Sequence, residues 1–156
     1  MADLAINQTH IIFVAGAVVK NGKILVGKRG AYESHAGGKW ALPGGKVDRT
    51  AGDCTNILEI TVCREIREET GLIIYPNKVQ YVSSDTFIRS TGHHVVALLF
   101  KCVYKTGVPK PGEDTDELAW AGIDDLDKFD WAGGVRQSLE KLLRQYGSWE
   151  PEALER

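Results

Sequence analysis

Runs of hydrophobic, β-branched residues alternate with short polar or glycine-rich segments along most of the chain. Residues 11–19 and 23–28 form two such runs, and the Asn21-Gly22 pair between them is typical of a tight hairpin turn. Four further runs have the length and composition of strands: residues 72–74, 78–89, 93–104 and 117–121. The pattern therefore predicts a sheet of several strands that begins with a hairpin.

Two other segments repeat hydrophobic residues every three or four positions, which is typical of amphipathic helices. The first begins at Asn56, whose side chain we expect to accept hydrogen bonds from the first-turn amides, with Glu59 completing a capping box. It ends at Gly71, which suits the left-handed residue after a helix. The second spans about 134–146, with a hydrophobic stripe of Val135, Leu139, Leu142, Leu143 and Tyr146. Strands mixed with two helices favour an α/β fold in layers.

The length, composition and charge fit one globular domain. The chain has 156 residues, of which 43% are hydrophobic and 26% charged, and its formal net charge is -2. We expect a single domain over residues 1–156, with a core at about 11–146. The tail, 147–156, lacks a periodic pattern and is expected to be mobile or to pack elsewhere. No polybasic run is present, so we expect no binding to a nucleic acid polymer through bulk charge.

The cysteines and the hydrophobic runs indicate the cellular setting. Three widely spaced cysteines without a CxxC pair predict neither a disulfide framework nor a zinc site, so a reducing cytoplasm is expected. The longest hydrophobic run, residues 11–19, is far shorter than the ~20 residues of a membrane-spanning helix. The first ten residues lack the pattern of a signal peptide. We therefore expect a cytoplasmic protein without a membrane partner, either a monomer or a homodimer.

The first predicted helix carries three glutamates, Glu65, Glu68 and Glu69, within an arc of about 100°. Glu65 and Glu69 lie on the same side as the inward-facing hydrophobic residues, whereas a solvated acidic face would lie opposite them. Three like charges so close together repel one another, and a divalent cation would relieve the repulsion because Mg²⁺ prefers carboxylate oxygens. An ordinary acidic surface helix is the alternative explanation.

The same helix and the glycines before it resemble a known motif. Gly45 and the run REIREETGL, residues 64–72, are similar to the Nudix box of the MutT-like hydrolases, Gx5Ex7REUxEExGU, where U is aliphatic. The first half of the box departs from this pattern, because about five residues are inserted within 49–55 and Asn56 stands where the family has its first glutamate. The resemblance covers most of the chain and implies the α/β Nudix fold, a mixed β-sheet sandwiched between α-helices.

The resemblance also implies a metal-dependent hydrolase. Glu65, Glu68 and Glu69 would bind Mg²⁺ or Mn²⁺. The carbonyl oxygen of Gly44 would be a further ligand, and Arg64 would orient the glutamates. Reactions of this family cleave a nucleoside diphosphate linked to another moiety, by attack of water on phosphorus. The bound ion would polarise the phosphoryl oxygens and acidify the attacking water.

The residue that takes a proton from this water is open among Glu68, Glu69 and Glu117. Glu117 begins the segment ELAWA, which resembles the family's ExxW strand, where the glutamate often supplies a distant ligand or a base. The alternative is that Glu117 is one of several acids in the run EDTDE and caps a loop. Both explanations of Glu117 stay open at this point.

Four residues are candidates for contacts with substrate, and each has a competing explanation. Arg29 ends a strand and would bind phosphates through its guanidinium fork, or would be solvated at the surface. His35 resembles a position that touches substrate in some relatives, or has no partner in its loop. Phe129 and Trp131 lie where relatives sometimes place an aromatic that stacks on the base, or they pack at the edge of the core.

The expected activity is Mg²⁺-dependent hydrolysis of a nucleoside triphosphate to the monophosphate and pyrophosphate, because the segment SHAGGKW, residues 34–40, resembles the MutT-type branch. ADP-ribose or a nucleotide sugar is the alternative substrate. The alternative from another class is a module that senses a nucleotide without turnover. Asn56 and the inserted loop favour that module, whereas the intact EIREE run argues against it.

Overall fold

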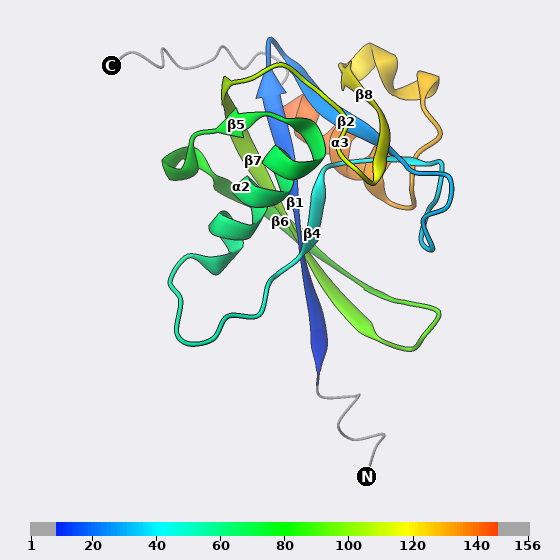
Figure 1. Ribbon diagram of the computed structural model, residues 1–156. Helices are drawn as coiled ribbons and strands as arrows, with labels where there is room; N and C mark the ends of the chain where they lie inside the picture. The colour runs from blue at the N-terminus through cyan, green and yellow to red at the C-terminus, as the bar shows by residue number, and fades with distance from the viewer. Residues whose placement is uncertain (1–8, 147–156) are drawn as a thin grey trace.

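A mixed β-sheet built around its first strand forms the centre of the molecule. The computed structural model describes residues 9–146. Strand β1 (His10–Lys20) runs parallel to β7 (His94–Thr106) along almost its whole length. On its other side, β1 pairs antiparallel with β4 (Gly44–Lys46) and, at its end, with β2 (Lys23–Arg29) (Figure 1). The predicted hairpin at Asn21-Gly22 is therefore confirmed.

The remaining strands extend the sheet outward from β2 and β7. Strand β2 pairs antiparallel with both β3 (Trp40–Ala41) and β8 (Thr115–Ala121). Strand β7 pairs antiparallel with β5 (Ile73–Ile74) and with the longer β6 (Gln80–Ile88), to which a hairpin connects it. In Figure 1 this hairpin projects from the body of the molecule on the same side as the loop between β2 and β3.

Two helices cover opposite faces of this sheet. Because neighbouring residues of a strand point to opposite faces, β1 supplies Val14 and Val18 to one core and Ala17 and Val19 to the other. The first core includes residues of α2 (Ile57–Thr70) and the second includes residues of α3 (Val135–Tyr146). The predicted α/β sandwich of helices around a mixed sheet is confirmed.

The start of α2 differs from the prediction, and its end agrees with it. Asn56 has the left-handed conformation, with φ 60°, and its side chain makes no capping hydrogen bond. A side-chain cap requires an extended backbone at this position, so the predicted capping box is wrong. At the other end, Gly71 has φ 75° and its N–H donates to the carbonyl of Arg67, as expected of a left-handed residue after a helix.

Short elements account for the other differences. Gly44 and Gly45, the glycines of the motif, are strand residues in β4, because β1 pairs with them directly. Strand β6 starts later than predicted because a 3₁₀ turn, η1 (Pro76–Lys78), precedes it. A second 3₁₀ helix, η2 (Ile123–Lys128), follows β8 and was not expected. The tail 147–156 and the side chain of Tyr146 lie outside the described residues.

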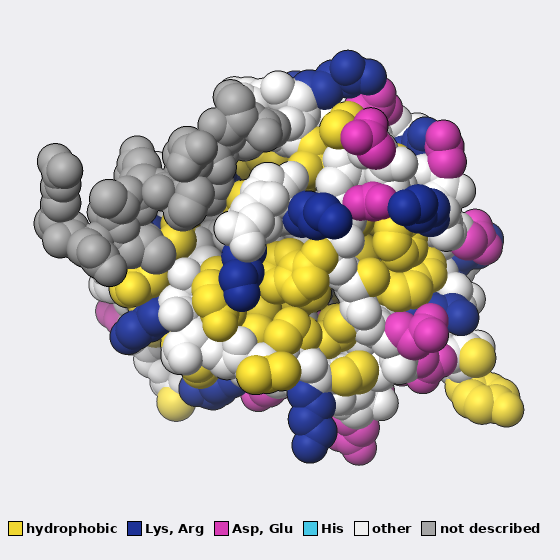
Figure 2. All heavy atoms as spheres, turned by 90° about the horizontal axis from the view of Figure 1, so that it is seen from above, with side chains coloured by type: hydrophobic (Ala, Val, Ile, Leu, Met, Phe, Trp, Pro, Cys, Tyr) yellow, Lys and Arg dark blue, Asp and Glu magenta, His cyan; other side chains and the backbone are white. Residues whose placement is uncertain are grey.

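The surface carries charges of both signs. Seen from above, Lys and Arg side chains alternate with Asp and Glu around exposed hydrophobic side chains (Figure 2). Within residues 9–146, no helix has the length and hydrophobicity needed to cross a membrane.

Candidate active site

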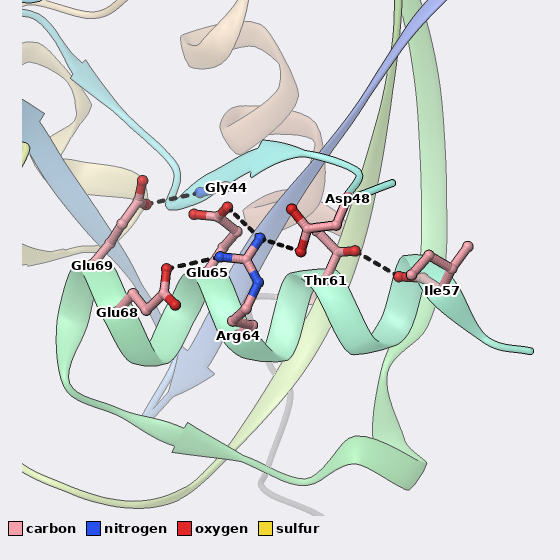
Figure 3. Close-up of polar contacts among 8 residues, drawn as sticks. All are labelled: Gly44, Asp48, Ile57, Thr61, Arg64, Glu65, Glu68 and Glu69. Carbon is pink, nitrogen blue, oxygen red and sulfur yellow. Dashed lines mark hydrogen bonds and ion pairs between the residues drawn. The ribbon is translucent and has the colours of Figure 1, made fainter. Parts of the chain in front are cut away.

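A cavity beside α2 brings together several of the sequence-predicted site residues, but not all of them. It has a volume of about 390 Å³, and its walls include Glu65 and Glu69 from α2 and the two glycines of β4, Gly44 and Gly45. Glu65 and Glu69 are one helical turn apart, so both point from α2 toward β4 (Figure 3). The sheet holds β4 against β1 and thereby fixes the distance between the glycines and the helix.

Glu69 is anchored to the backbone of β4. Its Oε2 accepts a hydrogen bond of 2.9 Å from the Gly44 N–H. Burial raises the pKa of Glu69 to about 7, although the Gly44 hydrogen bond acts in the opposite direction. The negative charge of Glu65 raises the pKa of Glu69 further. The surroundings of Glu69 therefore compensate its negative charge poorly.

Glu65 lies directly against Gly45. Its side chain is only 15% exposed, and a Cβ atom at Gly45 would overlap the Glu65 carboxylate. Only glycine therefore leaves room for Glu65 in this orientation. Burial raises the pKa of Glu65 above its ordinary value, against the opposing effect of the Arg64 guanidinium.

Arg64 binds three acids at the outer edge of the cavity. One of its terminal nitrogens, Nη2, is 2.9 Å from Glu65 Oε1 and 2.8 Å from Asp48 Oδ2. The other, Nη1, donates to Glu68 Oε2 at 2.8 Å (Figure 3). Arg64, which the sequence predicts to orient the glutamates, thus contacts Glu65 and Glu68 directly. Glu68, however, is 54% exposed and does not line the cavity.

The donor set suits a hydrated divalent cation held by few protein ligands. Within the described part of the chain, no three acidic, histidine or cysteine side chains converge as a complete cation site. Glu65 and Glu69 nevertheless present two crowded carboxylates to one cavity. Oxygen ligands are what Mg²⁺ prefers, and this ion keeps several waters. The residues fit such an ion, while Glu68 is paired with Arg64 outside the cavity.

Arg29 and His35 both line the cavity, as two of the predicted substrate contacts. The Nε of Arg29 donates to the His35 carbonyl oxygen at 2.9 Å, and one of its terminal nitrogens lies 3.5 Å from Glu33. The end of β2 thus holds the guanidinium of Arg29 in one orientation at the cavity wall. Charged hydrogen bonds of this kind leave part of the fork available to an anion.

Glu117 does not line the cavity. It pairs with Lys28 across the β2–β8 ladder, and its carboxylate is 3.7 Å from Lys28 Nζ. The acid that β8 and its preceding loop bring to the cavity is instead Asp114, whose negative charge raises the pKa of Glu69. The run EDTDE signalled an acid here, but the sequence did not indicate which of its members faces inward.

Phe129 and Trp131 are packed together away from the cavity. The Phe129 ring lies 4.8 Å from that of Trp40 and 5.1 Å from that of Trp131, between ring centroids. The Trp131 Nε1–H donates to the Leu126 carbonyl oxygen at 2.7 Å. Both aromatics pack against the core that includes α3. Their position supports the packing alternative, and the stacking on a nucleotide base stays a prediction.

Two basic residues that sequence reasoning missed also line the cavity. Lys46 follows the glycines of β4, and Arg89 belongs to the β6–β7 hairpin. Lys46 was detectable because it follows the motif's glycines directly. Arg89 lies far from the motif in sequence, so only the pairing of β6 with β7 brings it to the site.

Comparisons with known proteins show which family the chain belongs to. The sequence matches the NUDIX domain family over residues 11–143. An ADP-ribose pyrophosphatase of Methanocaldococcus jannaschii is 32% identical over 88% of this chain and 73% of its own length. A putative 8-oxo-dGTP diphosphatase 2 of Mycobacterium tuberculosis is 31% identical over 85% of this chain and 88% of its own.

Solved structures give the same result. A MutT NUDIX hydrolase from Burkholderia pseudomallei has a TM-score of 0.67 and 28% identity, and the match covers 88% of this chain and 98% of that one. The NUDIX domain of Shewanella oneidensis NrtR, solved with ADP ribose, shares the fold with a TM-score of 0.72 at 18% identity, over 88% of this chain and 89% of that one. With its motif, fold and relatives in agreement, the chain belongs to the Nudix hydrolase family.

Proposed function

We propose that the protein hydrolyses a pyrophosphate bond of a nucleoside triphosphate and releases the nucleoside monophosphate, with Mg²⁺ or Mn²⁺ as cofactor. One observation carries the proposal: Glu65 and Glu69 share a cavity of about 390 Å³ with Arg29. Catalysis at a nucleotide's phosphates needs both a metal cation and positively charged side chains. The two glutamates of this cavity can hold the cation, and Arg29 is the positively charged side chain. Nudix hydrolases generally use a divalent metal ion, which agrees with this cofactor.

Each residue of the site has a defined task in this proposal. Glu65 holds the cation, and Arg64 keeps the Glu65 carboxylate in place through their 2.9 Å contact. Arg29 binds a phosphate, in an orientation set by the His35 carbonyl and Glu33. The bound ion supplies polarisation of the phosphoryl oxygens and compensation of the leaving group's charge.

Proton transfer is assigned to Glu69. Of the three acids that the sequence left open, Glu69 alone lines the cavity. The carboxylates of Glu68 and Glu117 are instead paired with Arg64 and Lys28. Glu69 uses Oε2 for the Gly44 N–H, so Oε1 is the atom that accepts the proton of the attacking water.

ADP-ribose is the second candidate substrate. One relative of this chain, at 32% identity, is named an ADP-ribose pyrophosphatase, while another is a putative 8-oxo-dGTP diphosphatase. The two reactions break the same kind of bond, and the cavity's acids and Arg29 serve both. The cytoplasmic location and the monomeric or homodimeric state expected from the sequence stay predictions.

The experiment is a substrate screen with identification of every product. Nucleoside triphosphates, ADP-ribose and nucleotide sugars are each incubated with the protein and Mg²⁺, Mn²⁺ or EDTA. We expect a nucleoside monophosphate as product with metal and none with EDTA. Saturable nucleotide binding without any phosphate-containing product would overturn the proposal and support the sensing module.

A further inference from the structure

Arg89 reaches the cavity from the hairpin between β6 and β7. Its backbone closes the turn, because its N–H donates to the His93 carbonyl at 2.9 Å and its carbonyl accepts from the Gly92 N–H at 2.8 Å. Its side chain lines the cavity that also contains Glu65 and Glu69. A cationic side chain on a separate element thus shares the cavity with the carboxylates of α2.

The guanidinium of Arg89 has a donor without a partner. Its Nε is buried and makes no hydrogen bond, and among residues 9–146 Arg89 forms no ion pair. Arg64 also has a buried, unbonded Nε, but its terminal nitrogens bind three acids. Arg29 is held by the His35 carbonyl and Glu33. A buried charged donor without an acceptor is costly, and an anionic ligand removes that cost.

A ring contact holds the Arg89 hairpin against the opposite loop. The rings of Phe87 and His35 are nearly parallel, with an angle of 4° between their planes and 6.4 Å between their centroids. Phe87 lies in β6, and Arg89 follows the end of that strand two residues later. His35 itself lines the cavity. The contact therefore links the hairpin that carries Arg89 to a residue of the cavity wall.

We propose that Arg89 binds a phosphate group of the nucleotide opposite the acids of α2, and that the Phe87–His35 contact positions it. This inference rests on the proposed function for the identity of the ligand. An arginine fork matches the geometry of a phosphate and binds it through two hydrogen bonds. Arg29 then serves one phosphate and Arg89 another, which suits a ligand that carries at least two linked phosphates.

The test is calorimetric binding of α,β-methylene ATP, whose α,β bridge cannot be hydrolysed, in EDTA and again with Ca²⁺. The variants are Arg89→Gln and Arg89→Lys, with Arg49→Gln on an exposed loop outside the cavity as the matched control. We expect Arg89→Gln to weaken binding by about tenfold or more under both conditions, because a hydrogen bond to a charged group is lost. The affinity of Arg89→Lys for the analogue should lie between those of Arg89→Gln and the parent, and the affinity of the control should equal that of the parent.

The positioning role of Phe87 has its own readout. Phe87→Ala should weaken binding of the analogue when Arg89 is present. It should have little effect on binding in the Arg89→Gln background, because Phe87 acts through Arg89. An equal effect in both backgrounds would contradict the positioning role. The proposal would be overturned if Arg89→Gln bound the analogue as tightly as Arg49→Gln does. If Arg89→Gln does not fold, the affinity of Arg89→Lys is compared with that of Arg49→Gln instead.

The outcome also separates this inference from the proposed function. If the parent binds the analogue through Arg89 but hydrolyses no nucleotide, the proposed reaction is wrong and the role of Arg89 stands. If the parent hydrolyses a nucleotide and Arg89→Gln has unchanged KM and unchanged affinity, the role of Arg89 is wrong and the reaction stands. With both correct, Arg89→Gln raises KM.

Discussion

At the scale of single residues, the cavity forces two carboxylates close together in a half-buried setting. Glu65 and Glu69 raise each other's energy when both are ionised, and burial adds to this effect. A protein that only needed stability would gain from replacing one of them with a neutral side chain. Their retention at the cavity wall is understandable if a cation binds there.

The raised pKa of Glu69 predicts a pH-dependent stability of the metal-free protein. Burial raises that pKa from 4.5 to about 7. Between these values the unfolded chain has lost the proton that the folded protein keeps, so the free energy of unfolding falls as the pH rises. Glu69→Gln removes the titration. Urea unfolding in EDTA should therefore show that this substitution increases stability more at about pH 8 than at about pH 5. The same gain at both pH values would contradict the prediction.

The two glycines of β4 are predicted to respond differently to alanine. At Gly44 a Cβ would overlap the backbone carbonyl of Val14, so Gly44→Ala should lower the free energy of unfolding by about 1–3 kcal/mol. At Gly45 the three atoms nearest to the Cβ would all belong to the Glu65 carboxylate, the end of a flexible side chain that can rotate away. Gly45→Ala should therefore keep its stability but bind Mn²⁺ more weakly. Chemical denaturation measures the stability of both variants, and Mn²⁺ titration measures their affinity for the ion. Equal destabilisation by the two substitutions would be inconsistent with this geometry.

At the scale of elements, α2 is well defined at its end and strained at its start. Asn56 has a left-handed backbone without a side-chain cap, and this conformation costs an L-residue about 1–2 kcal/mol, with asparagine among those that tolerate it best. The helix is held instead by its hydrophobic face, where Val62 and Ile66 are fully buried.

Substitutions at Asn56 distinguish strain from capping. If the left-handed backbone dominates, Asn56→Gly should increase the free energy of unfolding by up to about 1 kcal/mol, while Asn56→Ala should decrease it. A capping side chain would instead make both substitutions destabilising. Thermal and chemical denaturation of the two variants provide the measurement, with loss of stability in Asn56→Gly as the contradictory result.

At the scale of the whole molecule, local patterns predicted most of the fold and part of the site. Runs of hydrophobic, β-branched residues on either side of Asn21-Gly22 identified β1 and β2, and the helical period identified α2 and placed Glu65 and Glu69 on its inward side. These features depend on residues close in sequence, so no knowledge of tertiary contacts was needed.

Features that depend on distant contacts were not predictable in this way. Glu68 shares its arc with the other glutamates, yet Arg64 draws its carboxylate away from the cavity. Glu117 is paired by the register of β8 against β2, and this register fixes the neighbour of each side chain. Asp114 and Arg89 reach the cavity because a loop and a hairpin fold over it. The outcomes for Glu117, Asp114 and Arg89 are decided by packing between elements that are far apart in the chain, whereas that of Glu68 is decided by an ion pair within its own helix.

The central claim, that the acids of α2 in this cavity drive nucleotide hydrolysis, is tested most directly by comparing kcat among three single variants. Glu65→Gln and Glu69→Gln alter the cavity, while Glu59→Gln changes the same residue type in the first turn of the same helix, outside it. With saturating Mg²⁺, the account predicts a loss of about a hundredfold or more for each cavity variant, and parental turnover for Glu59→Gln. Parental turnover in both cavity variants would contradict it.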